Sequence, residues 1–393
     1  MKSPIINFFM LVTLLITAPL VYAQTANMDT LIKQLDASAQ QAMKASGAPG
    51  MAMAIVQNNK IVFMKGYGVR KAGQPAQVTT DTVFRVASVS KPFTSTLTGI
   101  LVEKQLMSWD DKVVQYVPAF ALKSPTNTQN LTVRDLLSHQ GGLPSHAYDD
   151  LIEANVPYET VRTRLREVNP TCAPGNCYNY QNVLYSVTAD VIKARTGKTF
   201  DQAMREQVFI PLGMNSASTT YEAMINHPNA AQPHVKSNGR WVSTKIKPTY
   251  YRVAPAGGVN ASIKDMANWL RAEMGHRPDV LSPSVISTIT TPAVTTNSEI
   301  YKYHSVKWRQ ARVKKAQYGL GWRIYDYAGR KMVYHRGGIE GYRAEVAYLP
   351  TEQIGIVTLW NSGAHVSDTM IPTLFDAYLG LPKTNWVQLA GNK

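Results

Sequence analysis

The chain has 393 residues, of which 45% are hydrophobic and 17% charged, and 41 Lys and Arg against 26 Asp and Glu give it a formal net charge of +15. The apolar fraction excludes a disordered chain, 25 Gly and 22 Pro exclude a collagen, and two cysteines exclude a disulfide scaffold or a four-cysteine zinc site. The positive charge would suit nucleic acid or an anionic surface, or it could have no specific partner.

The first 23 residues have the pattern of a secretory signal peptide. Lys2 precedes an apolar run from Ile5 to Val21, and the run ends in Val21-Tyr22-Ala23 with short residues at the −3 and −1 positions of a cleavage site. The run is short and is interrupted by polar residues and a proline, which argues against the alternative, a retained membrane anchor. We therefore expect cleavage after Ala23, export to the periplasm, a mature chain of residues 24–393 and no stable membrane anchor.

Next in chain order come a predicted helix over residues 30–45 and a predicted β-hairpin over residues 50–68, where two apolar stretches flank an Asn-rich turn. The middle of the chain has mostly helical patterns, and its end returns to strands. Helices are predicted over residues 94–106, 133–138, 183–196, 199–207, 263–273 and 366–378, and strands over residues 321–327, 331–335, 344–349 and 354–360.

This order of elements predicts an α+β fold, because a doubly wound fold would need strict alternation of strands and helices. We expect an antiparallel sheet built from both chain ends and flanked by helices, over about residues 24–105 and 315–393. A mostly helical lobe over about residues 106–314 would be inserted into it.

Several signatures of other functions are missing from the chain. It has no Gly-x-Ser-x-Gly elbow, no His-Glu-x-x-His zinc motif and no zinc-finger or RNA-binding signature. Arg195–Thr199 looks like the tail of a phosphate-binding loop, but Ile192 stands where that loop needs glycine. We therefore expect no metal, no cofactor and no nucleic-acid partner.

The chain contains one Ser-x-x-Lys sequence, at Ser88 and Lys91. An apolar helical pattern follows at once, so Ser88 would lie at a helix N-terminus with Lys91 on the same face. A serine hydroxyl needs a base to become a nucleophile, and a lysine can serve once burial or nearby cations lower its pKa. The backbone N–H groups there would also suit an oxyanion. The alternative is that Ser88 caps the helix and Lys91 is solvated.

These residues resemble the first motif of the serine β-lactamase and penicillin-binding protein superfamily. Further segments follow in the order of its class C branch, and the resemblance covers about residues 30 to 380. These segments are Leu136–Pro144, Tyr180–Asn182, Phe209–Met214, Pro255–Ser262, Tyr318–Trp322 and His335–Gly338. The resemblance implies a β-lactamase/transpeptidase-like fold.

The resemblance also implies roles for residues of the first two motifs. Ser88 would be the nucleophile that forms an acyl-enzyme, and Lys91 would tune its proton transfer. Tyr180 would act in general acid and base catalysis, with a packed aromatic residue as the alternative. Asn182 would orient Lys91 and a substrate amide, with a turn-stabilising asparagine as the alternative.

The third motif departs from the family pattern at His335, where class C β-lactamases usually have Lys. A neutral imidazole attracts a substrate carboxylate less than an ammonium does, although Arg336 beside it could supply the missing charge. The resemblance places the backbone N–H groups of Ser88 and Gly338 in the oxyanion hole, and Gly337 and Gly338 allow close backbone approach. We therefore expect the four residues from His335 to Gly338 to bind substrate, and efficient β-lactam turnover is in question.

Cys172 and Cys177 surround a Pro-Gly turn just before Tyr180. In an oxidising compartment they would form a disulfide that rigidifies the approach to Tyr180, and two free thiols are the alternative.

The stretch from residue 300 to 325 contains seven Lys and Arg but no Asp or Glu. It could attract an anionic cell-wall polymer or an acidic substrate, or it could be a solvated loop. Asn361 and Arg343 are weaker candidates for substrate contact, with a loop asparagine and a solvated arginine as the alternatives.

The sequence as a whole predicts an exported serine hydrolase that works through a Ser88 acyl-enzyme on β-lactams or D-amino-acid peptides. A small-ester hydrolase of the same family and a penicillin-binding protein with little turnover are the alternatives. A basic surface-binding protein is supported by the charge alone.

Overall fold

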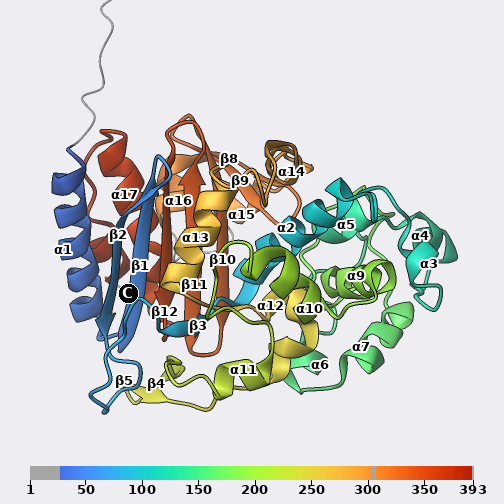
Figure 1. The fold of residues 1–393 in the computed structure, drawn as a ribbon, viewed down its shortest axis with the longest axis horizontal. Helices are drawn as coiled ribbons and strands as arrows, with labels where there is room; N and C mark the ends of the chain where they lie inside the picture. The colour runs from blue at the N-terminus through green and yellow to red at the C-terminus, as the bar shows by residue number, and fades with distance from the viewer. Residues whose placement is uncertain (1–26, 302–306, 392–393) are drawn as a thin grey trace, which may run out of the picture.

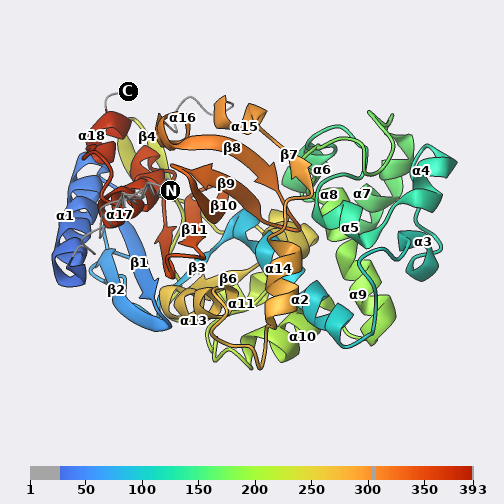
Figure 2. The ribbon, with the colours of Figure 1, turned by 90° about the horizontal axis from the view of Figure 1, so that it is seen from above.

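A computed structural model describes residues 27–301 and 307–391. It places an antiparallel sheet between layers of helices, with a lobe of short helices at one end (Figures 1 and 2). The predicted signal peptide, residues 1–23, lies outside the described residues. In the part of the chain that the structure covers, no helix is both long and apolar enough to cross a membrane.

The main sheet has eight antiparallel strands in the order β2-β1-β12-β11-β10-β9-β8-β7. Because β1 pairs with β12, the N-terminal hairpin adjoins the last strand of the chain, which confirms the predicted sheet built from both chain ends. The strands are β1 (Gly50–Gln57), β2 (Lys60–Gly68), β7 (Val294–Thr295), β8 (Val313–Tyr318), β9 (Arg323–Tyr327), β10 (Arg330–Ile339), β11 (Tyr342–Leu349) and β12 (Ile354–Trp360).

Helices cover both faces of this sheet. One face is covered by α1 (Met28–Ser46), α17 (Met370–Tyr378) and α18 (Trp386–Gly391), and the other by α2 (Ser90–Glu103) and α13 (Ile263–Glu273). Alternate residues of β1 enter the two cores, because successive strand side chains point to opposite faces. The expected α+β class is thereby confirmed.

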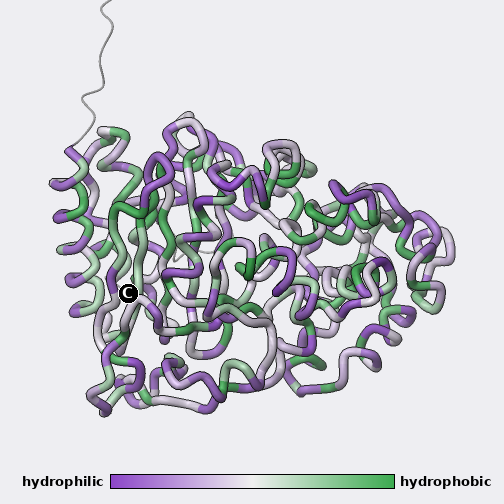
Figure 3. Tube along the Cα trace, in the orientation of Figure 1, coloured by the Kyte–Doolittle hydropathy of each residue, from purple (hydrophilic) through white to green (hydrophobic). Residues whose placement is uncertain are grey.

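The outermost helix, α1, shows how local sequence sets its limits. The side chain of Asn27 accepts a hydrogen bond from the Asp29 N–H at the start, and Gly47 ends the helix with a φ of 62°. Along α1, hydrophilic and hydrophobic residues alternate at helical spacing (Figure 3), and Leu31 and Leu35 face the sheet.

The inserted lobe consists of short helices joined by long connections. The helix predicted over residues 183–196 is divided at Val187. The remaining helices of the chain are α3 (Val113–Tyr116), α4 (Pro125–Asn130), α5 (Val133–Leu137), α6 (Asp149–Glu153), α7 (Tyr158–Arg164), α8 (Val183–Ser186), α9 (Thr188–Thr196), α10 (Phe200–Met204), α11 (Tyr221–Ile225), α12 (Ala254–Gly257), α14 (Pro283–Ile289), α15 (Ser298–Tyr301) and α16 (Lys307–Arg312), of which α16 packs on the same face of the sheet as α1.

Two small sheets complete the fold. β3 (Val83–Arg85) pairs with β6 (Asn260–Ser262), and β4 (His234–Ser237) pairs with β5 (Arg240–Ser243). The first of these leads directly into the Ser88 segment.

The end of β10 is the part of the sheet that positions the site. β9 pairs with β10 only as far as Tyr334, whereas β11 pairs with β10 as far as Ile339. Among the described strands, residues 335–339 therefore have a strand partner on one side only. Their other edge is open beside the helical lobe.

Candidate active site

Ser88 lies in the connection between β3 and α2. It is the central residue of a 3₁₀ turn, Ala87–Val89, and α2 begins at Ser90. Ala87 has a φ of 49°, a left-handed conformation that a non-glycine residue rarely adopts. Ser90 Oγ donates to the Ala87 carbonyl at 2.6 Å and accepts from the Val259 N–H at 2.9 Å, which anchors the turn.

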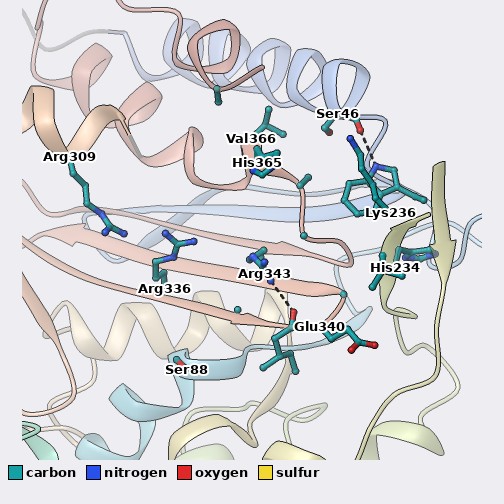
Figure 4. A pocket seen from close by; sticks show the side chains of 18 of the residues that line it. Ser46, Ser88, His234, Lys236, Arg309, Arg336, Glu340, Arg343, His365 and Val366 are labelled. Carbon is teal, nitrogen blue, oxygen red and sulfur yellow. Dashed lines mark hydrogen bonds between the residues drawn. The ribbon is translucent and has the colours of Figure 1, made fainter. Parts of the chain in front are cut away.

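Ser88 lines a cavity of about 660 Å³ together with Tyr180, Arg336 and Gly338. In Figure 4 Ser88 lies at one end of this cavity, Ser46 and Lys236 lie at the other end, and Arg343 lies between them. The half-buried Ser88 is thus open to a ligand from one side.

Lys91, the second residue of α2, is completely buried. Its Nζ donates to Asn182 Oδ1 at 2.7 Å and to the Ala256 carbonyl at 3.1 Å. Burial holds the pKa of Lys91 well below its ordinary value, nearby Asp149 raises this pKa again, and Arg323 lowers it. A neutral amine is therefore far easier to reach here than for a lysine in water.

Tyr180 lies between two cations. The Lys91 Nζ is 4.4 Å from the centre of its ring, and the guanidinium carbon of Arg323 is 5.6 Å from it. Such cations stabilise a negative charge on a phenol oxygen. Ser88, Lys91, Tyr180 and Asn182 are thus brought together, as the motifs predict.

The open end of β10 approaches the Ser88 turn very closely. A Cβ atom on Gly337 would lie 2.1 Å from the Val86 carbonyl oxygen and 3.0 Å from the Ser88 nitrogen. Only glycine permits this approach. It brings the Ser88 and Gly338 segments to the same end of the cavity, as an oxyanion hole requires.

His335 lies in the protein interior, unlike Arg336 and Gly338, which line the cavity. It is completely buried, its Nε2 lies 3.2 Å from the Tyr318 hydroxyl, and it is not among the residues that line the cavity. Burial, Arg323 and Lys91 together hold the pKa of His335 well below its ordinary value, so its ring is neutral. Arg336, the next residue, does reach the cavity wall.

The cavity wall carries more cations than acids. Glu299 pairs with Arg323, and Glu340 pairs with Lys247 outside the cavity. Arg343 donates through Nη1 to the Ile339 and Tyr342 carbonyls, and within the described chain it has no carboxylate in ion-pair distance. The charged residues of the wall are Lys236, Arg309, Arg323, Arg336 and Arg343 against Glu299 and Glu340.

Of the basic stretch over residues 300–325, residues 302–306 lie outside the described residues, and the rest is only partly solvated. Lys314 and Lys315 are exposed, but Arg309 and Arg323 are buried and line the cavity. In the sequence, Arg323 stands out only as part of this basic stretch. Its position directly after Tyr318–Trp322 was the signal that could have identified it.

Asn361, a weaker sequence candidate, does not line the cavity. Its Nδ2 donates to the Val69 and Arg70 carbonyls, both at 3.1 Å, so it joins β12 to the segment after β2.

The predicted disulfide between Cys172 and Cys177 is confirmed. Its loop is held against the segment after α5, because Gly175 donates to the Gln140 carbonyl and Asn179 to the His139 carbonyl. The next residue is Tyr180, so the loop fixes the approach to the site. Among residues 27–301 and 307–391, no three His, Cys, Asp or Glu side chains form a cluster suited to a metal ion.

Comparison with known proteins identifies the class to which this fold and site belong. Residues 35–376 match the family model described as beta-lactamase, so the chain belongs to the β-lactamase family. The chain is similar to an unguisins hydrolase from Aspergillus campestris, with 29% identity over 80% of this chain and 58% of the relative.

Two further relatives extend this comparison. A D-aminopeptidase from Brucella anthropi is 26% identical over 88% of this chain and 62% of its own length. The penicillin-binding protein 4 of Amycolatopsis lactamdurans is 25% identical over 84% of this chain and 85% of its own length. The chain therefore spans about three fifths of the first curated relatives it matches.

The fold has a counterpart of known structure in the octameric penicillin-binding protein homologue from Pyrococcus abyssi. The TM-score is 0.78 at 24% identity, over 89% of this chain and 78% of the other. This likeness supports the fold alone.

Proposed function

We propose that the chain is a serine hydrolase that cleaves amide bonds in D-amino-acid peptides or β-lactams through an acyl-enzyme on Ser88. The observation that supports this most is the shared cavity, in which Ser88 and Tyr180 meet the open edge of β10 beside Lys91. The D-aminopeptidase and penicillin-binding protein among the relatives agree with this substrate class.

The groups of the site supply each step of acylation. Neutral Lys91 takes the Ser88 proton while Oγ attacks the carbonyl carbon, and the N–H groups of Ser88 and Gly338 bind the resulting oxyanion. Tyr180 gives its proton to the leaving nitrogen, the C–N bond breaks, and the acyl group stays on Ser88. In the second step Tyr180 takes a proton from a water molecule as its oxygen attacks the ester carbon. The ester C–O bond then breaks, Lys91 returns its proton to Ser88 Oγ, and the acid is released.

The charge of the cavity indicates an anionic group on the substrate. Arg323, Arg336 and Arg343 all line the wall that holds Ser88. A carboxylate near the scissile bond would meet these guanidinium groups, which bind carboxylates through paired N–H donors. A D-amino-acid peptide with a free carboxyl end and a β-lactam both carry such a group.

A small-ester hydrolase is the second candidate. The buried, neutral His335 stands where class C β-lactamases usually have Lys, so that position contributes no charge toward a carboxylate. A penicillin-binding protein with little turnover would also be acylated at Ser88, but it would not hydrolyse the acyl-enzyme efficiently.

A single experiment distinguishes the three candidate functions. The purified chain and its Ser88→Ala variant are incubated with a penicillin, with D-Ala-D-Ala and with a p-nitrophenyl ester, and products and intact mass are followed. Turnover of the dipeptide or the penicillin, lost in Ser88→Ala, is the expected result. Ester turnover without any penicillin adduct favours the esterase, a stable penicillin adduct favours the binding protein, and no reaction at intact Ser88 contradicts all three.

We further propose that residues 1–23 are removed on export and that the mature chain works in the periplasm. The signal-peptide pattern and the Cys172–Cys177 disulfide support this, because disulfides persist in oxidising compartments. There an anionic cell-wall polymer would be attracted to the basic cavity. N-terminal sequencing of protein from the periplasmic fraction should begin at Gln24, and an uncleaved cytoplasmic chain would contradict the proposal.

A further inference from the structure

Asp149, the first residue of α6, lies behind the pair of Lys91 and Asn182. Asn182 Nδ2 donates to Asp149 Oδ2 at 2.7 Å, while Asn182 Oδ1 accepts from Lys91 Nζ at the same distance. We propose that Asp149 is a positioning residue, which holds the Asn182 amide with its oxygen toward Lys91 and places a negative charge behind this pair. This inference rests on the proposed function, because it gives Lys91 a role in acylation.

A carboxylate can hold an asparagine in one orientation. The two ends of an amide have nearly the same shape, but one accepts hydrogen bonds and the other donates them. An ionised Asp149 only accepts, so the Asn182 NH₂ must face it and the Asn182 oxygen must face Lys91. Asn182 is only 5% exposed, so water cannot replace a lost partner. A flipped amide would set its own donors against the donors of the Lys91 ammonium.

The chain ties Asp149 to the segment of Tyr180. The Asp149 N–H donates to the His146 carbonyl at 3.1 Å, and the His146 N–H donates to the Tyr180 carbonyl at 2.8 Å. The His146 Nδ1 also lies 2.7 Å from Asp149 Oδ2. A movement of Asp149 would therefore disturb Asn182 and the Tyr180 backbone together.

The second oxygen of this carboxylate argues against a purely structural role. Asp149 Oδ1 is buried and has no hydrogen-bond partner among the residues that the structure describes. An unpaired buried carboxylate oxygen costs stability. A residue kept only for local folding would be expected to satisfy both oxygens.

Asp149 is the negative group in a largely cationic surrounding. Burial lowers the pKa of Lys91, Asp149 raises it, and Arg323 lowers it. Removal of the Asp149 charge would lower the pKa of Lys91 further, so the neutral amine would persist to lower pH. The titratable groups that face Lys91 are Asp149 from α6, Arg323 from β9, His335 from β10, His139 from the loop after α5, Tyr180, and Tyr185 from α8.

Two substitutions distinguish the effect of the Asp149 charge from its effect on the orientation of the Asn182 amide. Asp149→Asn keeps an acceptor oxygen for Asn182 but removes the charge, whereas Asp149→Ala removes both. On a p-nitrophenyl ester, Asp149→Asn should move the acidic limb of kcat/KM to lower pH and reduce kcat by about tenfold or less. Asp149→Ala should reduce kcat by about 100-fold with little change in KM, because the reacting groups are displaced. Melting temperatures are measured alongside.

Asp150 provides the matched control, because it is the exposed neighbour in the same helix. Asp150→Ala should keep wild-type kcat and pH dependence. Unchanged kcat and an unchanged acidic limb in both Asp149 variants would overturn the inference. If Asp149→Ala does not fold, the acidic limb of Asp149→Asn decides. A wild-type chain that never acylates at Ser88 refutes the proposed function, whereas normal acylation in the Asp149 variants refutes only the positioning role.

Discussion

At the scale of single residues, the site depends on groups whose charge is set by burial. Lys91 is fully buried with two hydrogen-bond acceptors, and His335 is fully buried and neutral. Arg343 differs from both, because it lies on the cavity wall, where it donates hydrogen bonds to the Ile339 and Tyr342 carbonyls. Its guanidinium also fills the space beside Gly338, where a Cβ would lie 3.2 Å from Nη1.

Arg343→Ala should therefore weaken binding of anionic substrates. A charged hydrogen bond contributes about 1.5–3 kcal/mol, so KM for a carboxylate-bearing peptide should rise about 10- to 100-fold with kcat nearly unchanged. The carboxamide form of the same peptide serves as the control, because it cannot form the ion pair. An equal loss with both peptides would show that Arg343 does not recognise the carboxylate.

The sequence predicts those site residues that lie close to one another along the chain. Ser88 and Lys91 are three positions apart at a helix start, and Tyr180 and Asn182 are two apart, so each pair is visible as a motif. The contact between Asn182 and Asp149 spans 33 residues of mostly irregular chain, and no spacing rule predicts it. The burial of His335 against Tyr318 is likewise a tertiary contact.

At the scale of elements, β10 and the Ser88 turn approach each other so closely that a side chain at Gly337 has no space. Gly337→Ala would set a Cβ 2.1 Å from the Val86 carbonyl oxygen, so the strand would have to move away. We expect kcat to fall about 100-fold and the melting temperature to drop. Gly338→Ala is the comparison, because its Cβ would meet only the flexible end of Arg343. Near-wild-type rates in Gly337→Ala would contradict this.

The packing of α2 on α13 contains a buried acid. Glu273 Oε1 lies 2.5 Å from the Thr96 hydroxyl, and that hydroxyl also lies 3.0 Å from the Pro92 carbonyl. One hydroxyl has one proton, so a protonated Glu273 that donates to Thr96 satisfies both contacts. Burial raises the pKa of Glu273 to about 8.

This acid should make stability depend on pH. The folded pKa lies above the unfolded value of about 4.3, so the unfolded chain loses the proton first. The stabilisation is complete below that unfolded pKa and is lost as pH rises through about 8. The melting temperature of the wild type should fall over this window relative to that of Glu273→Gln. Parallel curves for the two proteins would contradict the assignment.

Element patterns explain which strands could be predicted. β1, β11 and β12 are apolar over most of their length because both of their faces are buried, and they stand out in the sequence. β8 was missed: its sequence, Val-Lys-Lys-Ala-Gln-Tyr, has adjacent exposed lysines and no alternation. The short helices of the lobe are held by tertiary packing and caps, which periodicity does not report.

At the scale of the whole molecule, part of the positive charge lies where it can act on a ligand. Five cationic side chains line the cavity that contains Ser88, against two acidic ones. Clefts with charge of one sign raise the local concentration of opposite ions and speed their association. This charge agrees with the anionic substrate that we propose.

The rate with an anionic substrate should therefore depend on salt. Between about 50 and 500 mM salt, kcat/KM for a carboxylate-bearing peptide should fall several-fold, because screening shortens the reach of the cavity charges. A neutral p-nitrophenyl ester measured in parallel should change little. The same slope for both substrates would mean that salt acts on the protein rather than on the encounter.

The pairing of β1 with β12 also determines when the chain can fold. Met51 lies opposite Trp360, so about 300 further residues must be synthesised after β1 before this pair of strands can form. Until then the apolar hairpin of β1 and β2 has neither its neighbouring strand nor the helix α17, and its hydrogen-bonding edge is bare. A translocating or nascent chain would pass through this stage with its longest apolar strand uncovered. Loss of the last 40 residues would leave every copy there.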